Sequence, residues 1–203
     1  MGTNTLLDIV GAIMIGGLLM LNMTRLYTSS SMHSGQYAME AIVEQNLVDV
    51  FTLMEGDLLK IGYMRGQENL SYSGQVITTA DTNKVVFLAD VDDDGSFETV
   101  EYSVGRRDSL TITNNPFDRP FYRKVDGAGP MIGSYGITQF FLEYFDHTGV
   151  KLATPVANKG QISTISITVA VESPYLSDTN FPDYNAKAYW KQVRLAIPNL
   201  RYK

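Results

Sequence analysis

The chain has 203 residues, of which 44% are apolar and 11% aromatic, so it is long enough and apolar enough for one or two folded domains. Its 22 acidic and 16 basic residues give a formal charge of −6, which argues against a nucleic-acid-binding protein. Because the sequence has no Cys and two His, disulfide frameworks and thiol nucleophiles are excluded and His-based catalysis is disfavoured.

The chain begins with an apolar segment at residues 5–23 (TLLDIVGAIMIGGLLMLNM), in which Asp8 is the one charged residue. A membrane-spanning helix needs about 20 apolar residues, and this segment is close to that length. A secretory signal peptide is the competing interpretation, but it would carry basic residues before the apolar run. We therefore expect residues 6–24 to be retained and to hold the protein in a membrane. Gly11, Gly16 and Gly17 either allow close helix contacts or mark a flexible segment.

An amphipathic segment follows at residues 36–62, where apolar residues recur every three or four positions, as on one face of an α-helix. The stripe consists of Met39, Val43, Leu47, Val50, Met54, Leu58 and Ile61, and Ile42, Phe51 and Leu59 widen it. The first Pro is Pro116, so we expect one helix from about 5 to 61, roughly 85 Å long. A small domain cannot cover that length, so the N-terminal half must meet lipid or other copies of the chain.

After residue 70 the apolar pattern alternates with a period of two, which predicts strands separated by turns. Residues 1–62 are thus predicted to form a long helix that inserts in a membrane or forms a core with other copies of the chain, and residues 63–203 an antiparallel β-rich head. The overall prediction is an α+β fold in which the long helix, first apolar and then amphipathic, packs on the sheet. The expected strands are Gln75–Thr79, Lys84–Ala89, Thr99–Val104, Ser109–Thr113, Ile137–Phe145, Gln161–Glu172 and Ala188–Ile197.

The acidic excess of the chain is confined to residues 90–101 (DVDDDGSFETVE), because the remaining residues balance at 16 acidic and 16 basic. This segment matches the twelve-residue calcium-loop pattern, with acids at positions 1, 3 and 5, Gly at 6 and Glu at 12. The residues on either side are strand-like, so we expect a β-hairpin tip and not an EF-hand pair. The candidate Ca²⁺ ligands are Asp90, Asp92, Asp94, Ser96, Glu98 and Glu101.

Two alternatives remain open for this segment. Strand alternation places Glu98 and Glu101 on opposite faces, so Glu98 would bind the metal in place of Glu101. The whole segment could also be an exposed acidic turn in which each Asp caps its own backbone without a metal.

Residues 5–10 (TLLDIV), together with the helix and the β-domain after them, resemble the type IV pilin and pseudopilin family. In that family a threonine, two apolar residues and a glutamate open the helix, and Asp8 stands at the glutamate position. The resemblance implies that Asp8 neutralises the N-terminal amine of a neighbouring subunit during assembly.

The C-terminal part resembles minor pilins and J-type pseudopilins. Residues 140–149 (FFLEYFDHTG) are similar to an aromatic strand that runs into a turn, and residues 189–200 (YWKQVRLAIPNL) to the closing strand of that group. Members of this group often carry an acidic hairpin tip, which is consistent with the calcium-loop prediction.

We therefore expect a structural subunit of an extracellular, cell-surface pilin-like filament, inserted in the cytoplasmic membrane before it joins a helical homo-polymer. No catalytic triad, phosphate loop or paired-carboxylate motif stands out, so an enzyme is not expected. One alternative is a minor pseudopilin of a type II secretion-type machine. The other is a monomeric, membrane-anchored, calcium-dependent binding domain with a surface or cell adhesion target.

Overall fold

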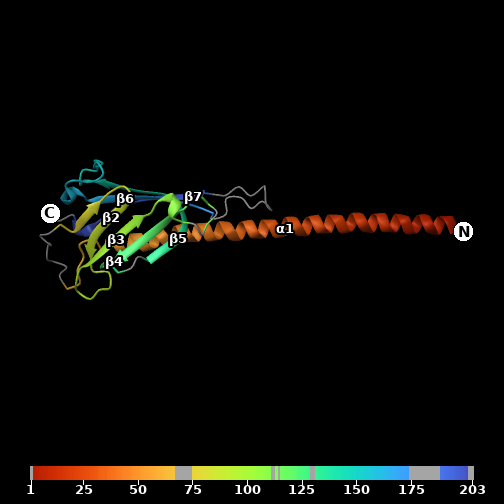
Figure 1. Ribbon diagram of the computed structural model, residues 1–203, viewed down its shortest axis with the longest axis horizontal. Coiled ribbons are helices and arrows are strands. Elements are labelled where there is room, and N and C mark those ends of the chain that lie inside the picture. The colour runs from red at the N-terminus through yellow and green to blue at the C-terminus, as the bar shows by residue number, and fades with distance from the viewer. Residues whose placement is uncertain are drawn as a thin grey trace.

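The computed structural model describes residues 2–66, 75–110, 113, 115–128, 131–173 and 188–200. One long helix is followed by seven strands that form a single sheet in chain order, each antiparallel to the next (Figure 1). The predicted α+β class is confirmed. The elements are α1 (Gly2–Leu59), β1 (Ile77–Ala80), β2 (Lys84–Ala89), β3 (Glu98–Val104), β4 (Arg119–Val125), β5 (Met131–Phe145), β6 (Thr164–Glu172) and β7 (Ala188–Ala196).

Helix α1 runs without interruption over 58 residues, which at 1.5 Å per residue is about 87 Å. Neither Gly16-Gly17 nor residues 28–35 break it. The hydroxyls of Thr24 and Thr28 donate to the carbonyl oxygens four residues earlier, at 2.9 and 2.8 Å. These polar side chains therefore stay compatible with the helix. The N-terminal half of α1 projects away from the head as a bare rod (Figure 1).

One predicted strand is wrong and one observed strand was missed. Arg107–Ser109 forms a 3₁₀ turn and Thr113 lies in a bend, so the described residues of the range 109–113 are not in a strand. Residues 111 and 112 lie outside the described residues. Its place in the sheet is taken by β4, in which basic residues and Pro120 conceal the apolar alternation. The proline is tolerated because the β4–β5 register shifts between Arg119 and Phe121.

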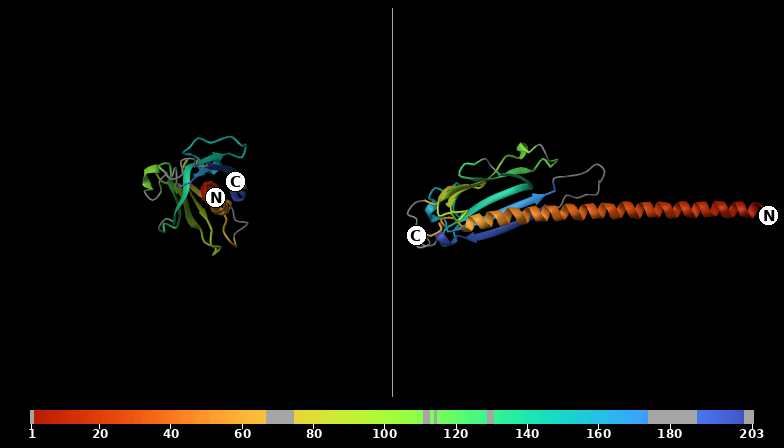
Figure 2. Two further views of the ribbon diagram at one scale, coloured as in Figure 1. Left: turned by 90° about the vertical axis from the view of Figure 1, so that its right-hand side faces the viewer. Right: turned by 90° about the horizontal axis from the view of Figure 1, so that it is seen from below.

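The C-terminal part of α1 lies along one face of the sheet (Figure 2) and contacts β5, β6 and β7. Its apolar stripe forms one wall of the core of the head. Phe51 is buried as predicted, whereas Ile42 and Leu59 are 53% and 39% exposed because they lie beyond the edge of the contact. The buried residues of the stripe are Val43, Leu47, Val50, Met54, Leu58 and Ile61.

The sheet contributes the other half of this core. In β6 the predicted inward set is Ile165, Ile167, Val169 and Val171, and all four side chains are fully buried. Since residues 43–61 and the sheet form one hydrophobic cluster, the core crosses the predicted division at 62/63. A fragment that began at residue 63 would therefore lack one wall of its own core.

A polar contact also joins α1 to the sheet. The Tyr102 hydroxyl of β3 and the Arg123 Nε of β4 donate to Asp57 Oδ2 at 2.5 and 2.8 Å. The side chains of Arg123 and Asp57 are only 17% and 13% exposed. The hydrogen bond that Arg123 donates to Asp57 raises the pKa of Arg123, and burial raises the pKa of Tyr102, so the guanidinium stays charged and the phenol neutral. The contact joins α1 to β3 and β4 beside the apolar core.

Met54→Ala tests the seam between α1 and the sheet. Met54 is fully buried, so we expect the substitution to lower the free energy of unfolding by about 2–5 kcal/mol. Val48 on the same helix is 45% exposed, and Val48→Ala should cost less than about 0.5 kcal/mol. Urea unfolding of the full chain in detergent micelles, followed by near-UV circular dichroism, measures both. Equal effects of the two substitutions would contradict the described packing.

Candidate functional site

The acidic segment forms the tip of the β2–β3 hairpin, beside the C-terminal end of α1. Ala89 pairs with Glu98, so the strands on either side of the tip are confirmed and helices do not flank it. Backbone bonds from Gly62 to the Leu88 carbonyl (2.9 Å) and from Asp90 to the Tyr63 carbonyl (3.0 Å) hold the chain after α1 against the hairpin. The end of the helix therefore fixes the position of the acidic tip.

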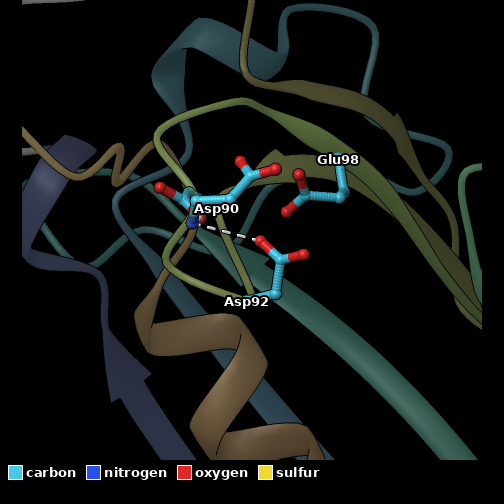
Figure 3. A group of neighbouring side chains, drawn as sticks. Asp90, Asp92 and Glu98 are labelled. Atoms are coloured by element: carbon cyan, nitrogen blue, oxygen red, sulfur yellow. Dashed lines mark hydrogen bonds between the residues drawn. The ribbon is translucent and has the colours of Figure 1, made fainter.

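Four of the predicted ligands are gathered at this tip. Carboxylate oxygens of Asp90, Asp92, Asp94 and Glu98 all lie within 4.8 Å of one another. Asp90 and Glu98 are buried, at 0% and 7% exposed, while Asp92 and Asp94 are exposed. Figure 3 shows the carboxylates of Asp90, Asp92 and Glu98 directed toward a common space. This oxygen set has the chemistry that a hard cation such as Ca²⁺ requires.

Backbone hydrogen bonds give the tip its shape. Asp90 accepts from the amides of Arg65 (3.0 Å), Asp94 (3.1 Å) and Gly95 (2.9 Å). Asp92 accepts from the Asp94 amide at 3.2 Å, and Asp94 from the Ser96 amide at 2.7 Å, which are successive Asx turns. The chain reverses at Gly95, whose φ of 90° is readily reached by glycine.

The two buried carboxyls are shifted in opposite directions. Burial alone would raise the pKa of Asp90, but hydrogen bonds from the surrounding amides outweigh it, so the pKa lies below its ordinary 3.8. Burial raises the pKa of Glu98 above 4.5, and the negative charges of Asp92 and Asp94 add to that rise against one amide bond from Val91. A bound cation would relieve the unfavourable burial of the Glu98 charge.

The other two predicted ligands are placed differently. Glu101 lies on the opposite face of β3, where Lys84 Nζ is 3.0 Å and Lys124 Nζ 3.7 Å from its carboxylate. Ser96 is exposed and contributes its backbone amide to Asp94. The structure therefore groups Glu98, and not Glu101, with the three aspartates.

Two basic residues at the tip were not predicted from the sequence. Lys60 Nζ donates to the Val91 carbonyl at 3.0 Å and contacts Asp93 at 3.2 Å. The Arg65 guanidinium donates to the Asp93 carbonyl at 2.9 Å. Lys60 lies near the end of the amphipathic segment and Arg65 just after it, but only the fold brings them to the hairpin. Both side chains bind the outer side of the tip. Among the described residues, no basic side chain forms an ion pair with the four candidate ligands Asp90, Asp92, Asp94 and Glu98.

The predicted assembly residues lie on the projecting half of α1. Asp8, Gly16 and Gly17 are exposed and Gly11 is partly exposed. A β-carbon placed on any of the three glycines would meet no atom within 4 Å, so the single chain gives them no packing role. Helix α1 is long and apolar enough to cross a membrane, and its most apolar stretch is unburied. A signal sequence meets the same criteria of length and composition.

Comparisons of the chain with protein-family models, curated proteins and solved structures give no match in any of the three.

Removing charge from each buried carboxyl should have opposite effects in calcium-free buffer at pH 7. The pKa of Glu98 is raised, so its stabilising contribution is present at low pH and is lost as pH rises above 4.5 and the buried carboxyl ionises. Glu98→Gln removes that buried charge and should raise the melting temperature at pH 7. Asp90→Asn should lower it, because a carboxyl with a lowered pKa stabilises above 3.8 and loses that contribution as pH falls. Thermal melts at pH 7 and pH 3 measure both effects; shifts of the same sign at pH 7 would contradict these electrostatics.

Proposed function

We propose that this chain is a non-enzymatic structural subunit of an extracellular pilin-like filament. The observation that carries the proposal is the division of α1 into two halves. Its C-terminal half is one wall of the head core, while its N-terminal half presents apolar side chains in all directions with no covering partner in the described chain.

The uncovered surface is too large and too apolar to remain in water. Between residues 6 and 27, about six turns of helix, its large apolar side chains are between 47% and 78% exposed. Surfaces of this kind are covered by lipid or by other proteins. The exposed apolar side chains are those of Leu6, Leu7, Ile9, Val10, Ile13, Met14, Ile15, Leu18, Leu19, Met20, Leu21, Met23, Leu26 and Tyr27.

The rigid connection to the head favours a polymer over a simple anchor. A membrane anchor can be joined to its domain by any flexible linker, whereas here one helix continues from the apolar half into the head core. A rod fixed to a head in one orientation lets identical copies pack side by side with a constant offset. Repeated head-to-tail contacts of this kind generate an open helical filament. The apolar halves would form its centre and the heads its outer wall.

Asp8 supplies a specific contact in this account. A carboxylate within an apolar helix is costly unless it has a partner. As the family resemblance implies, that partner is the N-terminal amine of a neighbouring subunit, and the pair sets the offset between subunits. Before assembly, the same apolar half would hold the chain in the cytoplasmic membrane.

The acidic tip is proposed to bind one Ca²⁺ through Asp90, Asp92, Asp94 and Glu98. Four carboxylates within 4.8 Å repel one another, and a divalent cation would reduce the formal charge of the chain from −6 to −4. Because the tip is bonded to the end of α1, the ion would stabilise the junction of hairpin and helix. A minor pseudopilin and a monomeric calcium-dependent adhesion domain share this feature, and filament formation distinguishes the three.

Replacement of Asp8 tests the assembly contact. Asp8→Ala should abolish filaments, because the apolar helix loses the charge that pairs with the neighbouring amine, while the head stays folded. Asp8→Glu keeps the charge and should retain them. Negative-stain electron microscopy of sheared surface material from cells that express each variant gives the filament yield. Normal yield from Asp8→Ala would exclude the charge-pairing role.

Calcium removal tests the acidic tip. An ion present at 100 times its Kd stabilises by about 2.7 kcal/mol, so EDTA should lower the melting temperature of the full chain in detergent by about 5–10 °C. Asp92→Asn should reduce this response, whereas Asp49→Asn, on an exposed face of α1, should leave it unchanged. An identical EDTA response in the wild type and Asp92→Asn would exclude the tip as the calcium site.

A further inference from the structure

A second polar cluster lies at the other end of β3 and β4, far along the strands from the acidic tip. It is formed by the segment that leads into β4 and by residues of β5 and β6. Gly105, just after β3, bonds to the Pro120 carbonyl through its amide, at 2.9 Å. Asp118 immediately precedes β4, and Glu172 is the last residue of β6. The aspartate is fully buried, at 0% exposed.

Three buried oxygens in this cluster have no hydrogen-bond partner among the described residues: both carboxylate oxygens of Asp118 and the Thr113 hydroxyl. The hydroxyl lies beside the carboxylate and lowers its pKa, but the pair does not reach hydrogen-bonding geometry. Buried polar atoms in folded proteins are almost always satisfied, so three orphaned oxygens in one place indicate a missing partner.

Glu172 adds a second negative charge to the same cluster. Its carboxylate oxygens accept from Thr138 Oγ1 at 3.2 Å and from Asn115 Nδ2 at 3.3 Å. These are neutral donors, and no basic side chain forms an ion pair with Asp118 or Glu172 in the described part of the chain. Burial raises the pKa of Asp118, and the charge of Glu172 raises it further.

The backbone holds the cluster in a fixed shape. Asn115 is 1% exposed, donates to the Ser173 carbonyl at 3.2 Å and accepts from the Phe117 amide at 2.9 Å. Gly136 has a φ of 70°, and a β-carbon there would collide with the Glu172 carbonyl oxygen, so β5 and β6 approach closely at this point. The oxygens are therefore presented by rigid elements.

We propose that Asp118 and Glu172, with the Thr113 hydroxyl, form a second cation site that takes a hard divalent ion, Ca²⁺. The ion would neutralise both carboxylates and supply the partner that the three orphaned oxygens lack. The site is separate from the acidic tip and does not depend on it.

Calcium stoichiometry tests this site. Isothermal titration of the full chain in detergent micelles with CaCl₂ should show one equivalent fewer for Asp118→Asn than for the wild type. The substitution keeps the shape of the side chain and removes the uncompensated charge, so in calcium-free buffer its melting temperature should equal or exceed that of the wild type. An unchanged stoichiometry in Asp118→Asn, including no binding in either protein, would overturn the proposal.

A variant that leaves the second site intact gives an independent test. The double variant D92N and D94N removes two carboxylates from the acidic tip and should still bind one equivalent of Ca²⁺. If it binds none, the second site does not exist, whatever the behaviour of Asp118→Asn. If the acidic tip does not bind Ca²⁺ but the second site does, the wild type should bind one equivalent. The double variant should then also bind one equivalent, and Asp118→Asn should bind none.

Discussion

The structure depends on one helix that has to satisfy two environments. Along residues 43–58 an apolar stripe of α1 is buried against the sheet, whereas Ile42, Val48 and Leu59 beside it are exposed. Along residues 6–27 the apolar side chains cover every face and nothing in the described chain contacts them. Because the helix is continuous, the orientation of the head is fixed relative to the apolar rod, and whatever covers the rod also positions the head.

The C-terminal end of the same helix organises the head. Asp57 binds Arg123 and Tyr102, which locks the helix to β3 and β4. Lys60 and Arg65 then reach the acidic hairpin tip, whose Asp90 accepts the Arg65 amide. An ion at the tip would therefore act on the junction between helix and sheet.

Periodicity made much of this fold predictable from the sequence. The 3.6-residue stripe specified the buried face of α1, and strict alternation specified β6, because in both cases one face meets a core. It failed where local signals conflict: Pro120 and basic residues conceal β4, and Gly133 and Gly136 conceal the first half of β5. The grouping of Glu98 with the aspartates follows from strand alternation. The contacts of Asp57 and Lys60 and the burial of Asp118 arise from tertiary packing, which single-sequence patterns do not encode.

The central claim is that the apolar half of α1 is covered by other copies of this chain. Immunogold electron microscopy of sheared cell-surface material, with an antibody against the head, tests it most directly. We predict thin filaments that carry the label along their whole length. Label confined to filament tips would instead support a minor pseudopilin. Label found only in the membrane fraction, with no filaments that contain this chain, would contradict the claim.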